Sequence, residues 1–231
     1  MLQIPLDFEL KVNATFDNFM AGDNAILLSA LRALSKSKND FIYIHGIKGS
    51  GKTHLLQALA HQASDFQDYN LAYLPLDTEG LTPELLSGFV GFDCVCLDDI
   101  SSIIEQINAL DWQEAIFHLY NQLKDQSKTL IITGNEAPTG IDIQLKDLKS
   151  RLSSMYIHEI KPLSDEGKKA YIQKKAQEKG LMLTEDLAAY LLVKGQRDLN
   201  SLTQSIIKLD AASLQAQRKI TKPFIKEVLG L

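Results

Sequence analysis

The sequence has little of what cross-linked, disordered or membrane-embedded proteins need. Its 231 residues include only 2 cysteines, 6 prolines and 13 glycines, against 45% hydrophobic and 23% charged residues. This amino-acid composition is typical of a packed globular protein. No apolar run approaches the roughly 20 residues that a membrane-spanning helix needs. The first ten residues carry acids where a secretory signal has a basic region. We therefore expect a cytoplasmic protein with a sizeable core.

The two cysteines do not indicate a disulfide or a metal site. Cys94 and Cys96 are one residue apart in an apolar, strand-like stretch. A disulfide at that spacing is implausible, and no nearby partners complete a zinc site. We expect both in the core.

The net charge of −5 hides an asymmetry between two regions. Residues 1–150 hold 10 basic and 20 acidic residues, whereas residues 151–231 hold 14 basic and 9 acidic residues. A basic terminal module can contact nucleic acid. Its lysines at 168, 169, 174 and 175 nevertheless alternate with other residues as on a solvated helix face, which is the commoner meaning of such a run.

The apolar pattern predicts strands that alternate with helices, followed by helices alone. Asp23 is positioned to cap a first helix with apolar residues from Ile26 to Leu34. Five short β-rich runs follow, at 41–45, 71–76, 94–97, 129–133 and 156–160, the first four separated by stretches long enough for crossover helices. After Pro162 the sequence predicts helices at 165–179, 185–193, 199–217 and 222–229. We predict an α/β fold, with a five-stranded parallel sheet flanked by helices and a small all-α domain.

The clearest motif lies between the first strand and the next helix. Gly46, Gly49, Ser50, Gly51, Lys52 and Thr53 fall within a complete G-x-x-x-x-G-K-[ST] pattern. This is a P-loop in its required context. Its backbone N–H groups and the helix N-terminus suit phosphate oxygens. Lys52 supplies charge to the outer phosphates, and Thr53 is a candidate Mg²⁺ ligand.

Polar residues at the ends of two further strands suggest the rest of a nucleotide site. Asp98 and Asp99 follow the apolar run that begins at Cys94, in a Walker B arrangement. Asp98 is the candidate on the metal side, and Asp99 is a candidate to orient an attacking water. Asn135 follows the next strand, at the same edge of the sheet, where a simple turn residue is the alternative.

Two arginines are candidates for contacts with phosphate. Arg151 precedes the last strand, and Arg197 opens a helix of the all-α region. An arginine supplied in trans stabilises charge that develops during phosphoryl transfer. Surface solvation, or pairing with neighbouring Asp147 or Asp198, is the alternative for each.

In this order, the motifs resemble those of AAA+ ATPases. Residues 15–19, Thr-Phe-Asp-Asn-Phe, and residues 51–56, Gly-Lys-Thr-His-Leu-Leu, are similar to the initiator clade that contains the bacterial replication initiator DnaA. The resemblance covers nearly the whole chain. It implies that His54 lies with the P-loop in the nucleotide site and that Asn135 is the sensor 1 residue. It also implies that Arg151 is the arginine finger and Arg197 the sensor 2 arginine.

The leader adds a second, shorter pattern. Gln3, Leu6 and Phe8 fit Gln-x-x-Leu-x-Phe, which is similar to the peptides that dock on the DNA polymerase sliding clamp. An edge strand with Leu6 and Phe8 in the core is the alternative. Because the chain stops where DnaA continues into its DNA-binding domain, we expect no direct sequence-specific DNA binding. Together these features resemble the family of DnaA regulatory inactivators, Hda.

The resemblance implies a domain plan and a function. We expect a clamp-binding leader at 1–14, a nucleotide-binding domain at 15–162 and a helical lid at 163–231. The family inhibits DNA replication initiation by stimulating ATP hydrolysis by DnaA while bound to the clamp, with ADP as the active ligand. We expect weak ATPase activity of the chain itself, because Asp99 stands where many AAA+ proteins carry Glu. Self-association into a homodimer stays open.

Two other functions are compatible with a P-loop. One is a helicase-loader-like ATPase that binds single-stranded DNA, which needs basic and aromatic residues along a channel. The acidic balance of residues 1–150 counts against it. The other is a small-molecule kinase, in which residues 15–19 and the two arginines have no role.

Overall fold

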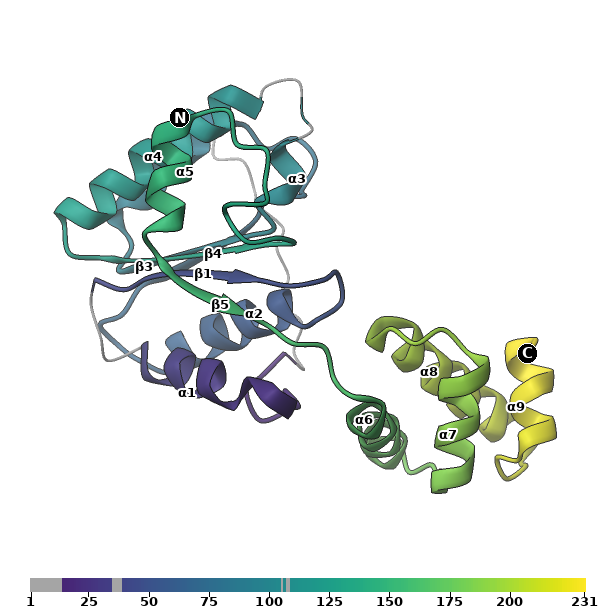
Figure 1. Cartoon of the computed structure of the whole chain (residues 1–231). Coiled ribbons are helices and arrows are strands. Elements are labelled where there is room, and N and C mark those ends of the chain that lie inside the picture. The colour runs from purple at the N-terminus through teal and green to yellow at the C-terminus, as the bar shows by residue number, and fades with distance from the viewer. Residues whose placement is uncertain (1–13, 35–38, 105, 107–108) are drawn as a thin grey trace. The chain divides into compact units, whose positions relative to one another are not determined.

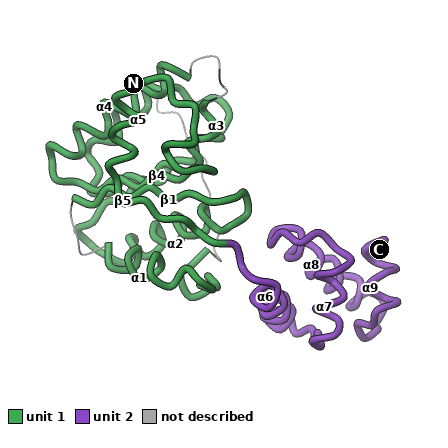
Figure 2. Tube along the Cα trace, viewed as in Figure 1, with its two compact units in different colours: residues 1–161 green, residues 162–231 purple. Residues whose placement is uncertain are grey.

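The structure is a computed structural model that describes residues 14–34, 39–104, 106 and 109–231. The chain divides into two compact units, Met1–Lys161 and Pro162–Leu231 (Figure 2). The predicted leader residues Gln3, Leu6 and Phe8 lie outside the described residues. None of the helices in the described part is long and apolar enough to cross a membrane.

The first unit is built on a parallel sheet of five strands. Its strands are β1 (Phe41–His45), β2 (Leu71–Pro75), β3 (Cys94–Asp98), β4 (Thr129–Gly134) and β5 (Tyr156–Glu159). Their order in the sheet is β2-β3-β4-β1-β5. The predicted α/β fold with a five-stranded parallel sheet is confirmed.

Helices cover both faces of this sheet (Figure 1). On one face lie α1 (Ala25–Ala33) and α2 (Lys52–Ala63); on the other lie α3 (Ser101–Ile104), α4 (Ala109–Asp125) and α5 (Lys146–Ser153). Successive residues of a strand point to opposite faces. In β1, Ile42 and Ile44 therefore belong to the cluster with α1 and α2, whereas Phe41 and Tyr43 belong to the cluster with α4 and α5. Both faces of the sheet are covered by buried clusters, which explains the nearly continuous apolar runs of the strands.

The second unit contains helices only. They are α6 (Asp165–Glu178), α7 (Glu185–Lys194), α8 (Leu199–Ala216) and α9 (Lys222–Leu229). Ser164, Asp198 and Thr221 cap α6, α8 and α9 by accepting hydrogen bonds from backbone N–H groups. Ile172, Leu191, Leu209 and Phe224 contribute to its own hydrophobic core.

Two details differ from the sequence prediction. The connection between β2 and β3 contains a 3₁₀ segment, η3 (Pro83–Gly91), instead of an α-helix. The helix near Asp23 starts after a short turn, η1 (Gly22–Asn24), and its N-cap is Asn24, with no side-chain capping bond. Asp23 is exposed, and Asn24 is buried because its side-chain amide bonds the backbone of Lys161.

The Asn24 amide bonds the last residue of the first unit. Asn24 Nδ2 donates to the Lys161 carbonyl (2.9 Å), and the Lys161 N–H donates to Asn24 Oδ1 (2.8 Å). Lys161 is the last residue of this unit. One side chain therefore satisfies both backbone groups of the residue at which the chain leaves the sheet domain.

We predict that Asn24→Ala lowers the free energy of unfolding by about 1–3 kcal/mol, because two backbone groups lose their partner. The exposed neighbour provides the control: Asp23→Ala should change stability by less than about 0.5 kcal/mol. Urea unfolding of both variants measures the difference. Equal losses would contradict the role given to Asn24.

Candidate nucleotide-binding site

The P-loop lies at the carboxyl edge of the sheet, between β1 and α2. The strands β1 and β4 pair so that His45 lies opposite Gly134, and the Gly46 N–H donates to the Gly134 carbonyl (3.3 Å). This pairing places the start of the P-loop beside the end of β4, where Asn135 follows.

Glycine is required at particular points of this loop. Gly49 has φ 81° and Gly51 has φ 107°, backbone conformations that residues with a Cβ rarely adopt. A Cβ on Gly46 would lie 2.6 Å from both Cγ2 and the carbonyl oxygen of Ile160. Backbone therefore approaches backbone too closely here for any larger residue.

Lys52 is buried and directed back into the loop. Its Nζ donates to the carbonyl oxygens of Gly46 (2.6 Å) and Ile47 (3.2 Å) and to Asn135 Oδ1 (3.2 Å). Burial lowers the pKa of Lys52, while Asp99 and Asp98 oppose the shift by favouring its charged form. A buried ammonium surrounded mainly by neutral oxygen atoms is an attractive partner for an anion.

Two hydroxyl residues flank Lys52 in different environments. Ser50 Oγ is buried and has no hydrogen-bond partner among the described residues, which fits a ligand that would occupy this loop. Thr53 is exposed in the first turn of α2. Together with the glycine conformations, these features fit a bound phosphate, and the exposed Thr53 hydroxyl is a candidate metal ligand beside it.

The Walker B carboxylate is held by two hydroxyl groups. Asp98 is 4% exposed. Thr133 Oγ1 donates to its Oδ1 (2.6 Å), and the Tyr73 hydroxyl donates to its Oδ2 (2.9 Å). The strands β3 and β4 are neighbours in the sheet, and so are β3 and β2.

Asp99 has a left-handed backbone conformation, and its carboxylate faces the Asn135 amide. Its φ is 61°. Its N–H donates to Thr133 Oγ1 (2.8 Å), and Asn135 Nδ2 lies 3.4 Å from its Oδ1. Burial raises the pKa of Asp99, Lys52 opposes the shift, and the charge of Asp98 adds to it. Asn135 thus lies between Lys52 and Asp99, so the three predicted site residues form one polar cluster.

His54 connects the P-loop helix to the segment before α1. A ring nitrogen of His54 lies 2.8 Å from the Thr15 carbonyl, and its ring centroid is 5.5 Å from that of Phe19. Phe19 also covers Gly51, where an added Cβ would lie 2.8 Å from Phe19 Cε2. Residues 15–19 therefore form one wall of the P-loop.

The two predicted arginines lie in different units. Arg151 belongs to α5, is half-buried, and has its guanidinium carbon 5.7 Å from the centroid of the Tyr120 ring. Arg197, just before α8, forms an ion pair with Asp165 at the start of α6. The alternative partners considered from the sequence, Asp147 and Asp198, do not pair with them among the described residues.

Sequence reasoning missed Tyr73 and the role of Thr133. No motif marks either residue. Both contacts depend on which strands are neighbours in the sheet, and only the strand order could have pointed to them.

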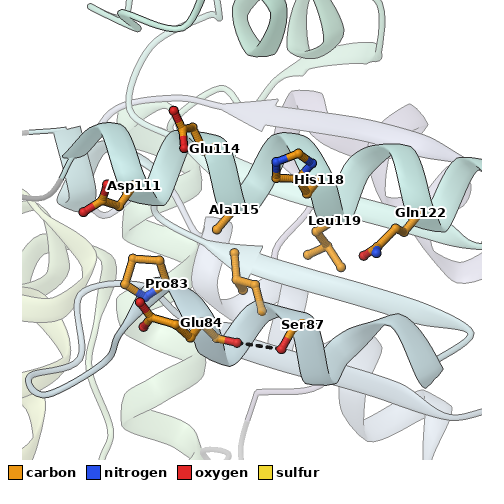
Figure 3. A pocket seen from close by; sticks show the side chains of 10 residues that line it. Pro83, Glu84, Ser87, Asp111, Glu114, Ala115, His118, Leu119 and Gln122 are labelled. Atoms are coloured by element: carbon orange, nitrogen blue, oxygen red, sulfur yellow. Dashed lines mark hydrogen bonds between the residues drawn. The ribbon is translucent and has the colours of Figure 1, made fainter.

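A separate cavity of about 360 Å³ lies between η3 and α4. Figure 3 shows Pro83, Ala115 and Leu119 between the two elements and Glu84 and Asp111 near one end. None of the predicted site residues lines it. The candidate site is therefore the polar cluster at the edge of the sheet.

Comparison with known proteins places both units in families. A family model described as the bacterial DnaA ATPase domain matches residues 10–160. A second model, described as the Hda lid domain, matches residues 165–229. The chain belongs to the Hda/DnaA-like family of AAA+ proteins. The resemblance predicted from its motifs is confirmed.

Individual relatives of this Hda/DnaA-like chain span most of its length. An uncharacterized protein of Haemophilus influenzae strain Rd is 37% identical over 232 residues, covering 99% of each chain. Domain III of DnaA from Thermotoga maritima has a TM-score of 0.83 at 22% identity, covering 96% of this chain and 98% of that one. AMPPCP-bound DnaA from Aquifex aeolicus has a TM-score of 0.73 at 25% identity, covering 89% of this chain and 67% of that one.

The raised pKa of Asp99 predicts how stability depends on pH. The folded protein binds this proton more tightly than the unfolded chain, whose ordinary value is 3.8. The contribution of Asp99 to stability is therefore present below pH 3.8 and is lost as pH rises through the folded pKa.

We predict that Asp99→Asn, measured without nucleotide, is more stable than the wild type at pH 7 and that its advantage shrinks as the pH falls toward 3.8. Thermal melts across this pH range measure it. Asp142→Asn, an exposed change in the same unit, is the control. An advantage that grows as the pH falls would contradict the prediction.

Proposed function

We propose that this chain is a negative regulator of DNA replication initiation. With a nucleotide bound, it contacts the initiator DnaA and stimulates ATP hydrolysis by DnaA, while its leader binds the DNA polymerase sliding clamp. The observation that carries this proposal is the combination of a DnaA-type ATPase domain with an Hda-type lid in one chain.

The nucleotide is an adenine nucleotide, and ADP is the form in which the regulator acts. DnaA of Aquifex aeolicus, similar over most of this chain, binds AMPPCP. Gly46, Gly49, Gly51 and Ser50 surround the phosphates, Lys52 neutralises their charge, and Thr53 and Asp98 hold Mg²⁺ directly or through water. Mg²⁺ supplies positive charge that offsets the charge of the phosphates. His54, in the P-loop helix, belongs to the site in this proposal, and Arg197, in the helical unit, is the sensor 2 arginine that the family resemblance implies.

Arg151 acts on the partner's nucleotide. Its guanidinium carbon lies 5.7 Å from the centroid of the Tyr120 ring, and the side chain forms no ion pair among the described residues. The turn after it is fixed: Ser154 Oγ donates to the Arg151 carbonyl (2.7 Å) and also lies 3.4 Å from the Tyr120 hydroxyl. A delocalised cation on a fixed helix end suits the stabilisation of charge on a γ-phosphate held by DnaA.

The chain's own nucleotide is mainly structural. In this proposal Asp99 orients the attacking water, but its carboxylate is already engaged by the Asn135 amide. Its side chain is also one methylene shorter than the Glu that many AAA+ proteins carry at this position, so it reaches less far toward a water beside the nucleotide. We therefore expect slow turnover of ATP by this chain.

We predict that Arg151→Ala removes the stimulation of DnaA, because arginine fingers contribute on the order of 10³ to 10⁵ in rate. The measurement is ATP hydrolysis by DnaA with clamp loaded on DNA. Arg32→Ala is the control, since Arg32 also lies over an aromatic ring in the same unit, that of Phe16, and differs in forming an ion pair with Asp17. Full stimulation by Arg151→Ala would eliminate the finger assignment.

We predict that replacing Gln3, Leu6 and Phe8 together by Ala weakens binding to the purified clamp on the order of 100-fold, because a few side chains carry most of the affinity of such contacts. Leu10→Ala, an apolar change beside the pattern, should bind like the wild type. Surface plasmon resonance with the full chain measures both. Undiminished binding by the triple variant would mean that the leader is not the clamp ligand.

A further inference from the structure

The Asp98 carboxylate accepts a hydrogen bond at each oxygen, one from each neighbouring strand. Thr133 on β4 donates to Oδ1, and Tyr73 on β2 donates to Oδ2. Because the two donors approach from opposite sides of β3, the carboxylate is restrained against rotation in both directions.

The Tyr73 hydroxyl is itself held by the P-loop helix. Gln57, in α2, is 6% exposed, and its Nε2 lies 3.4 Å from the Tyr73 oxygen. Tyr73 packs against the hydrophobic cluster beneath α2, which also contains Cys96, its partner in the β2–β3 register. A chain of contacts therefore runs from the P-loop helix through a residue of β2 to the Walker B carboxylate.

This arrangement has the form of an outer-shell support. Carboxylates that ligate metals are held in turn by hydrogen-bond donors, and loss of such a donor typically costs 10–100-fold in metal affinity. The Tyr73 hydroxyl donates a hydrogen bond to Asp98. Its strand, β2, contributes none of the P-loop, Walker B or sensor residues.

We propose that Tyr73 is a positioning residue whose hydroxyl orients the Asp98 carboxylate for the Mg²⁺ that accompanies the bound nucleotide. This inference rests on the part of the proposed function that places Asp98 on the metal side of the site. It assigns to β2 a role in metal affinity that is separate from the stimulation of DnaA.

Tyr73→Phe tests the proposal because it deletes the hydroxyl and keeps the ring in the hydrophobic cluster. ADP affinity of the full chain is measured by calorimetry in a chelator and across a Mg²⁺ titration. The affinity in chelator should stay within about twofold of the wild type. The Mg²⁺ concentration that gives half of the affinity gain should rise on the order of tenfold.

Two controls separate positioning from packing. Tyr69→Phe deletes another buried hydroxyl beside the same cluster, one that does not bond Asp98, and should leave the Mg²⁺ dependence unchanged. Thr133→Val should shift the Mg²⁺ midpoint in the same direction as Tyr73→Phe, whereas Thr133→Ser retains the donor and should restore it. If the Tyr73 side chain served only in packing, Tyr73→Phe would leave the Mg²⁺ midpoint unchanged, as Tyr69→Phe should.

Each remaining outcome decides against the proposal. An unchanged or lowered Mg²⁺ midpoint in Tyr73→Phe would show that the hydroxyl does not support the metal side. Loss of ADP binding in chelator as well would show that Tyr73 supports the nucleotide site as a whole. If the wild type itself gains no ADP affinity from Mg²⁺, the assignment of Asp98 in the proposed function fails, and the inference fails with it.

Discussion

The position of β4 between β1 and β3 is the constraint on which the rest of the site depends. Because β4 pairs with both strands, the ends of all three meet at one edge of the sheet. Lys52 can then reach Asn135, and Thr133 can reach Asp98. An order that moved β3 to the far side of the sheet from β1 would separate the P-loop from the acidic residues, although every motif would remain in the sequence.

The electrostatics of this edge follow from the same geometry. A buried ammonium has two carboxylates nearby, and its direct partners are two carbonyl oxygens and an amide oxygen. Charge inside a protein is costly unless it is paired and hydrogen-bonded. In the proposed function, phosphate oxygens supply the negative charge that the direct partners of Lys52 do not provide. Asp98 then lies on the metal side of the ligand, and Asp99 on the side of the attacking water.

Much of the fold could be predicted from the sequence, because its signals are local. The strand positions followed from β-rich apolar runs, and the P-loop followed from a pattern whose fixed residues each meet a backbone, charge or hydroxyl requirement. Lys52, Asn135 and Asp99 could be assigned to the same edge because parallel strands share an edge. The residue at the N-cap of α1 could not be predicted, since Asp and Asn are both common N-caps. Asn24 is the buried one because its amide bonds the Lys161 backbone.

The remaining details depend on contacts between segments that are distant in the sequence. Tyr73 has the same local pattern as any strand tyrosine, and its bond to Asp98 exists only because β2 lies beside β3. The 3₁₀ segment η3 likewise replaces the expected α-helix in a connection whose length alone would have allowed one. In the proposed function, the choice of partner depends on a surface that includes Arg151, and no local sequence rule predicts such a surface.

The most direct measurement of the central claim is a calorimetric titration of ADP into the wild type and into Lys52→Ala. The account predicts that the wild type saturates at about one equivalent. Lys52→Ala should bind on the order of 10 to 100 times more weakly, because a charge-assisted hydrogen bond contributes about 1.5–3 kcal/mol. Equal affinity of the two chains, or no binding by the wild type, would contradict it.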